Sequence, residues 1–143
     1  MGMIRLNSET ITIPHLPVMN PPSNPVGWFE IYVQDIERAK AFYQGLFAVR
    51  LERLPLPEPE MWAFPFNDSA VGCGGALVHM PGKDSGSGGT IIYFSCADCA
   101  EAAGRAASLG GTIQRPKFSI GPYGFIAFVL DTEGNLIGLH SQS

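Results

Sequence analysis

The chain has 143 residues and a formal net charge of −4, from 9 basic and 13 acidic side chains. This length is enough for one domain with a buried core, and the basic residues form no cluster that would favour a nucleic-acid partner. The apolar runs are too short to cross a bilayer, no segment has the pattern of a secretory signal, and three cysteines are too few for a disulfide scaffold. We therefore expect a cytoplasmic protein that binds neither nucleic acid nor membrane.

Residues 1–25 are rich in proline and predict an N-terminal extension, because proline removes backbone donors and disfavours helix at the preceding residue. The β-branched and aromatic run at 26–33 predicts the first strand of an ordered domain. Asp35 is a good N-cap for a helix with one apolar stripe, which we expect to pack on that strand. The stripe consists of Ile36, Ala39, Phe42, Tyr43, Leu46 and Phe47. Three short strands are expected next, at about 49–54, 61–66 and 74–80.

The same order of elements appears again after a glycine- and serine-rich linker at 81–89. A strand at 90–96 leads to Asp98, the cap of a second helix that Gly110-Gly111 ends. The helix has an apolar stripe of Cys99, Ala102, Ala103, Ala106 and Leu109, and strands follow at about 112–115, 125–130 and 136–140. The sequence therefore predicts one α+β domain, 26–143, of two strand–helix–three-strand modules, about 26–80 and about 90–143. The alternative is two unrelated α+β halves.

Side chains alternate across a strand, so each predicted strand has two distinct faces. In the first strand Phe29, Ile31 and Val33 form an apolar face that should lie under the helix. The other face carries larger side chains with polar tips. If the second faces of the two modules meet, they enclose a pocket lined by Trp28, Glu30, Tyr32, Tyr93 and His140. An aromatic cavity with one carboxylate and one imidazole suits a small organic ligand.

Other candidates are weaker. Trp62 is predicted to line the apolar wall of the pocket or to be ordinary core. Tyr123 stands on a glycine-rich loop. It is predicted to be either a lid residue near the mouth of the cleft or a simple turn residue. Cys96 and Cys99 have C-x-x-C spacing, but both fall on helix-packing faces, so we expect structural cysteines.

Two segments resemble the vicinal oxygen chelate superfamily, which includes glyoxalase I, bleomycin-resistance proteins and extradiol dioxygenases. They are Asp-Ile-Glu-Arg-Ala-Lys-Ala-Phe-Tyr at 35–43 and Asp-Thr-Glu-Gly-Asn-Leu-Ile-Gly-Leu-His at 131–140. The resemblance covers about 26–142. It implies paired βαβββ modules that form curved mixed sheets around a central cleft, a ligand in that cleft, and usually a homodimer.

The resemblance also assigns four positions to metal ligands in the family's metalloenzymes. In this chain they fall on Trp28, Ile91, Gly138 and a position near Gly75, none of which can coordinate a metal. Glu30 and His140 each lie two residues beyond such a position, and they could face each other across the cleft. With His79 they form a weak alternative set for a divalent metal.

Three functions follow from this pattern. The leading prediction is a glyoxalase-like, homodimeric protein that binds a small apolar or aromatic molecule without the usual metal site. The cofactor stays unknown, with none favoured and a divalent metal possible. The alternative is a lyase, isomerase or dioxygenase that uses Glu30 and His140 as an acid–base pair or as metal ligands. The third is a dimeric interaction module without a ligand, which would have no ligand-sized cavity behind Trp28.

Overall fold

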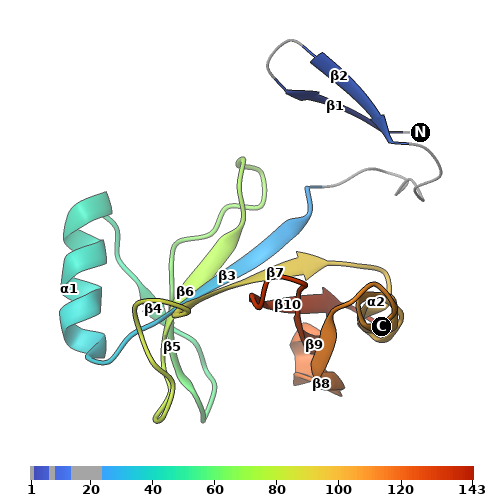
Figure 1. Cartoon of the computed structure of the whole chain (residues 1–143). Helices are drawn as coiled ribbons and strands as arrows, with labels where there is room; N and C mark the ends of the chain where they lie inside the picture. Colours follow the sequence, from blue (N-terminus) through green and yellow to red (C-terminus); the bar gives the residue numbers. More distant parts are fainter. Residues whose placement is uncertain (1, 7–8, 14–23) are drawn as a thin grey trace.

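A computed structural model gives the fold and describes residues 2–6, 9–13 and 24–143 (Figure 1). Strands β1 (Gly2–Leu6) and β2 (Glu9–Ile13) pair antiparallel as a two-stranded sheet. The proline pattern did not indicate this hairpin, because its prolines begin only at Pro14. The rest of the predicted extension includes residues 14–23, which lie outside the described residues.

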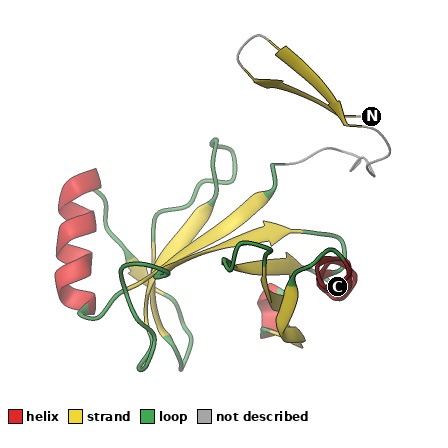
Figure 2. Cartoon of the chain, viewed as in Figure 1, coloured by secondary structure: helices red, strands yellow, loops and turns green. Residues whose placement is uncertain are grey.

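The domain that follows contains one mixed sheet of eight strands and two α-helices (Figure 2). The elements are β3 (Val26–Tyr32), α1 (Ile36–Phe47), β4 (Glu52–Arg53), β5 (Glu60–Ala63), β6 (Gly74–His79), β7 (Thr90–Ser95), α2 (Cys99–Ser108), β8 (Thr112–Ser119), the 3-10 turn η1 (Gly121–Tyr123), β9 (Phe125–Leu130) and β10 (Leu136–Ser141). The strand order is β4-β5-β6-β3-β7-β10-β9-β8.

The two halves of this sheet have the same topology. The first strand of each module runs parallel to its last, β3 beside β6 and β7 beside β10, while the other pairs are antiparallel. Strands β3 and β7 run antiparallel and join the two modules. The predicted α+β fold of two paired modules is confirmed.

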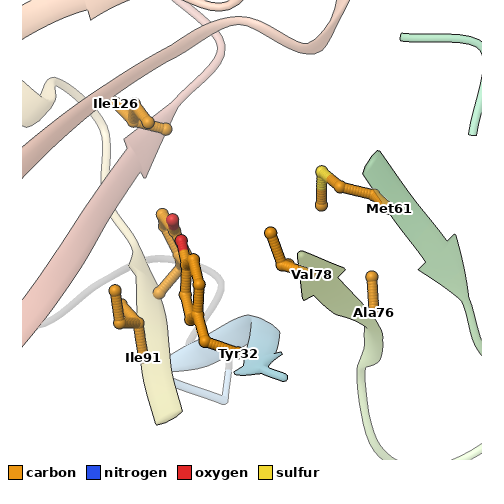
Figure 3. Packing of buried hydrophobic residues seen from close by; sticks show 7 residues of the cluster. Tyr32, Met61, Ala76, Val78, Ile91 and Ile126 are labelled. Carbon is orange, nitrogen blue, oxygen red and sulfur yellow. The ribbon is translucent and has the colours of Figure 1, made fainter. Parts of the chain in front are cut away.

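One side of the sheet, here called the Glu30 face, carries Trp28, Glu30 and Tyr32 of β3. The register places Ala76 and Val78 of β6 on this face, beside Glu30 and Tyr32. Buried side chains on this face form an apolar cluster of Tyr32, Met61, Ala76, Val78, Ile91, Tyr93 and Ile126. Figure 3 shows the Tyr32 ring between Ile91 and Val78. The centre of this core is therefore built from the first strands of both modules.

The opposite side of the sheet, the helix face, has its own core. Cys99 and Ala103 of α2 are buried against Ala127, Val129 and Leu139. Phe94, Cys96 and Ile137 pack around this cluster. These are the faces that strand alternation predicts for β7 and β10.

Both predicted helix starts are confirmed. The Asp35 side chain accepts the backbone N–H of Arg38 at 3.0 Å, and the Asp98 side chain accepts that of Ala100 at 2.9 Å. Such caps satisfy N–H groups that have no partner within the helix. Helix α2 ends at Ser108 with Leu109 as its C-cap, and Gly110 follows with φ of 99°, a conformation that favours glycine.

The predicted apolar stripe of α1 is only partly covered, which corrects the prediction that it packs on the sheet. No residue of α1 is buried, and Phe42, Leu46 and Phe47 are 60%, 59% and 58% exposed. Tyr43 makes the main aromatic contact with the sheet side, 5.7 Å from Phe64 between ring centroids. Leu109 is also exposed, because it lies beyond the last turn of α2.

Strand β8 is longer than the sequence predicts. The predicted strand ends at about residue 115, yet the observed strand continues through Pro116 to Ser119. It lies at the edge of the sheet, and its pairing with β9 shifts register between Arg115 and Phe118. An edge strand tolerates a proline at such an irregularity because the missing N–H need not meet a neighbouring strand.

Candidate functional site

A buried carboxylate lies at the centre of the Glu30 face. Glu30 Oε1 accepts hydrogen bonds from the hydroxyl groups of Tyr32 and Tyr93, both at 2.9 Å. Its Oε2 accepts one from Trp28 Nε1 at 3.2 Å. Glu30 is only 8% exposed. Trp28, Glu30, Tyr32 and Tyr93 form what we call the Glu30 group.

Neutral donors stabilise this carboxylate, since no ion pair among residues 24–143 includes Glu30. A carboxylate has about four lone-pair directions, so three hydrogen bonds leave about one free, at Oε2. Burial, followed by the charge of Glu30, raises the pKa of Tyr32 and of Tyr93 well above the ordinary tyrosine value. Both phenols therefore keep their protons and remain donors to Glu30.

Apolar side chains next to the Glu30 group are only partly buried. Those that pack against the same cluster are Leu54, Leu56, Phe118, Ile120, Phe128 and Leu136. They come from both modules, so the Glu30 face offers an apolar surface with a few polar atoms at its centre. This is the composition of sites for small organic molecules.

The structure does not bring His140 to this group. Trp28, Tyr93 and Gly138 lie in one row across β3, β7 and β10, and Glu30 and His140 each stand two residues beyond that row. Because β3 and β10 run in opposite directions, the two offsets add to about 13 Å along the strands. His140 Nε2 instead lies 2.6 Å from the carbonyl oxygen of Tyr123, to which it donates.

The other predicted residues also lie away from the Glu30 group. Trp62 and His79 occupy the helix face, because their neighbours Met61 and Val78 point to the Glu30 face. Tyr123 is 44% exposed and contacts His140 through its backbone carbonyl. Cys99 is fully buried, and burial raises the pKa of the half-buried Cys96 thiol, in line with structural cysteines.

Of the positions that the resemblance assigns to metal ligands, one is Trp28 itself and two are glycines covered by aromatic rings. A Cβ at Gly138 would collide with the ring of Tyr93, so this ring covers the glycine. The fourth position is Gly74 rather than Gly75, because Gly74 is in register with Trp28, and a Cβ there would lie 3.1 Å from the indole. Among the described residues, no group of three His, Cys, Asp or Glu side chains could hold a metal ion. The residues present do not fit the family's divalent metal.

Two hollows that the sequence did not indicate lie along α1, and neither is behind Trp28. The first, of about 520 Å³, is lined by Ile31, Tyr32, Val33, Gln34, Asp35, Arg38, Ala39, Phe42, Tyr43, Ser85, Gly86, Gly89 and Thr90. The second, of about 530 Å³, is lined by Lys40, Gln44, Arg50, Leu51, Glu52, Arg53 and Trp62. Sequence periodicity gives no information on such spaces, because they depend on how far a helix stands from the sheet.

Comparison with known families agrees with the topology. The family model of the glyoxalase/bleomycin resistance protein/dioxygenase superfamily matches residues 26–139. The chain belongs to this superfamily. The predicted resemblance is therefore confirmed at the level of the family. No curated protein matches the chain.

Solved structures similar to this superfamily member include a hypothetical protein, BH1468, from Bacillus halodurans C-125, with a TM-score of 0.62 and 14% identity over 82% of this chain and 94% of the other. A variant of methylmalonyl-CoA epimerase from Streptomyces coelicolor, in complex with 2-nitronate-propionyl-CoA, has a TM-score of 0.60 and 19% identity over 82% and 94%. Methylmalonyl-CoA epimerase from Mycobacterium tuberculosis has a TM-score of 0.59 and 16% identity over 83% and 88%. At these identities the likeness shows the fold alone. In the described part of this chain, no helix has the length and apolar character needed to span a membrane.

Proposed function

We propose that this superfamily member binds a small apolar or aromatic molecule on the Glu30 face, without a metal ion. The observation that carries the proposal is the buried Glu30 carboxylate, held by three neutral donors and surrounded by partly buried apolar side chains. Its free lone-pair direction at Oε2 favours a ligand that donates an N–H or O–H hydrogen bond. An amine would also balance the buried negative charge.

Similar structures support a small ligand in this fold. The solved Streptomyces coelicolor epimerase is in complex with 2-nitronate-propionyl-CoA.

The alternative reaction by Glu30 and His140 is not supported, because a shared proton or metal requires contact and the register separates the two residues by about 13 Å. The cytoplasmic location stays a prediction from the sequence.

Three matched aromatic probes test the ligand proposal: benzylamine, benzyl alcohol and benzoate. The Trp62→Phe variant keeps Trp28 as its single tryptophan, so its fluorescence reports on the Glu30 group. We expect benzylamine to change this fluorescence most, benzyl alcohol less, and benzoate least, because benzoate offers no donor and repels the carboxylate. Glu30→Gln should weaken benzylamine binding about tenfold, because a charge-assisted hydrogen bond is lost.

Tyr123→Phe is the control, since the Tyr123 hydroxyl takes no part in the Glu30 group. It should leave benzylamine affinity unchanged. If none of the probes changes Trp28 fluorescence, or if benzoate binds as well as benzylamine, the proposal is wrong. The first of these results would favour the interaction module without a ligand.

The predicted homodimer is supported by the exposed apolar side of α1, formed by Phe42, Leu46 and Phe47. Large contiguous apolar surfaces are uncommon on monomers and are typical of interfaces. We expect sedimentation to give a dimer, and we expect the double variant Phe42→Ser/Leu46→Ser to sediment as a monomer. Leu109→Ser is the matched control, because Leu109 is equally apolar and exposed but lies after α2. A wild-type monomer would contradict this assignment.

A further inference from the structure

We propose that the second hollow along α1 is a binding site for a phosphate-type dianion, separate from the Glu30 group. Its walls come from α1, from the loop after it and from β4 and β5, and this open hollow has a volume of about 530 Å³. It lies toward the helix face, because Trp62 and Arg53 are paired there, opposite to the face of Met61. A ligand in this hollow would therefore not touch the Glu30 carboxylate.

The charge of the hollow is positive although the whole chain is negative. Lys40, Arg50 and Arg53 line it, and Glu52 is the only acidic lining residue. Arg53 pairs with Trp62 and Glu52 with Ala63, so the Glu52 side chain alternates to the other face of β4. Among residues 24–143, neither Arg50 nor Arg53 forms an ion pair. Two arginines without an ion-pair partner among these residues therefore line the hollow.

Lys40 and Trp62 form the floor of this site. Lys40 Nζ lies 3.3 Å from the centroid of the Trp62 ring, and its side chain is only 14% exposed. Its carboxylate neighbour Glu37 is 3.5 Å away and largely exposed, which makes a weak ion pair. Trp62 Nε1 donates to Glu60 Oε1 at 3.1 Å, and this bond fixes the indole. The ammonium group is therefore held over the ring, and its ion pair with the largely exposed Glu37 neutralises it only weakly.

The remaining polar group of the hollow is also a donor. Gln44 lies one turn beyond Lys40 on α1, and its Oε1 accepts the backbone N–H of the buried Leu51 at 3.0 Å. This bond turns the Gln44 amide nitrogen, with its two hydrogens, away from Leu51. Amide, ammonium and guanidinium groups together offer donors, so an anion with several acceptor oxygens is the matching ligand.

A phosphate or diphosphate group suits this set better than a single carboxylate. One guanidinium group can donate two parallel hydrogen bonds to two oxygens of a phosphate, while a lysine ammonium group supplies a point charge. Three cationic side chains line the hollow, which favours an anion with two charges. An extended nucleic acid is not favoured, because the cations line one hollow instead of a continuous surface track.

The two tryptophan indole N–H groups give two separate NMR reporters, Trp62 for this hollow and Trp28 for the Glu30 group. We would titrate ¹⁵N-labelled protein with inorganic pyrophosphate and with inorganic phosphate, at constant ionic strength maintained by KCl. We expect the Trp62 signal to shift and saturate while the Trp28 signal stays in place, and pyrophosphate to bind more tightly than phosphate. Arg53→Gln and Arg50→Gln should each weaken pyrophosphate binding about tenfold.

Arg38→Gln is the control. It also removes one positive charge, but Arg38 lies on α1 and lines the first hollow. It should leave pyrophosphate affinity unchanged. The proposal is overturned if the Trp62 signal does not move, or if KCl alone moves it equally. It is also overturned if Arg38→Gln weakens binding as much as Arg53→Gln, because the effect would then be general screening. None of these outcomes depends on whether the aromatic probes bind at Trp28.

Discussion

Replacement of Glu30 by leucine is expected to lower the free energy of unfolding by about 3–5 kcal/mol. The substitution leaves the hydroxyl groups of Tyr32 and Tyr93 and the Trp28 indole N–H without their acceptor. Each buried donor without a partner costs about 1–3 kcal/mol, and the added apolar surface offsets only part of this. Urea unfolding followed by circular dichroism measures the loss.

Two further variants separate hydrogen bonding from packing. Glu30→Gln should cost only about 1–2 kcal/mol, because its carbonyl oxygen can still accept both phenols while its amide opposes the Trp28 donor. Combining Glu30→Leu with Tyr32→Phe and Tyr93→Phe should recover much of the lost stability, since both phenol donors are then removed as well. If the two Tyr→Phe replacements instead lower the stability of Glu30→Leu further, the hydroxyl groups stabilise the protein without their acceptor. The Glu30 group is then not a coupled network.

Gly138→Ala is expected to destabilise the protein by about 2–4 kcal/mol. The new Cβ would overlap the Tyr93 ring, so the ring must move. Any such movement also weakens the hydrogen bond from Tyr93 to Glu30. Thermal or urea unfolding measures the change.

Gly104→Ala is the matched control for this glycine. Gly104 is exposed in the middle of α2, and a Cβ there meets nothing within 4 Å. Alanine should therefore stabilise the helix, by about 0.5–1 kcal/mol. In a Tyr93→Ala background the added cost of Gly138→Ala should nearly disappear. A cost that stays the same without the ring would show that the contact with Tyr93 is not its cause.

Local sequence patterns were enough to predict the elements of this protein and the faces of its strands. Alternation placed Trp28, Glu30 and Tyr32 on one side of β3, and the spacing of Asp35 and Asp98 located both helix starts. These properties depend on backbone geometry over a few residues, which the local pattern records. The duplicated pattern and the two family-like segments were sufficient to predict two paired modules.

The assembly of these pieces into a site depends on contacts between distant parts of the chain. The antiparallel direction of β3 and β10 separates Glu30 from His140, and the register of β5 turns Trp62 toward Lys40. The space along α1 depends on how closely the helix approaches the sheet. Strand direction, register and helix distance are all set by residues far apart in the sequence. A periodic pattern within one strand or helix carries no record of them, so the sequence could name the polar residues of the Glu30 face but could not say which of them meet.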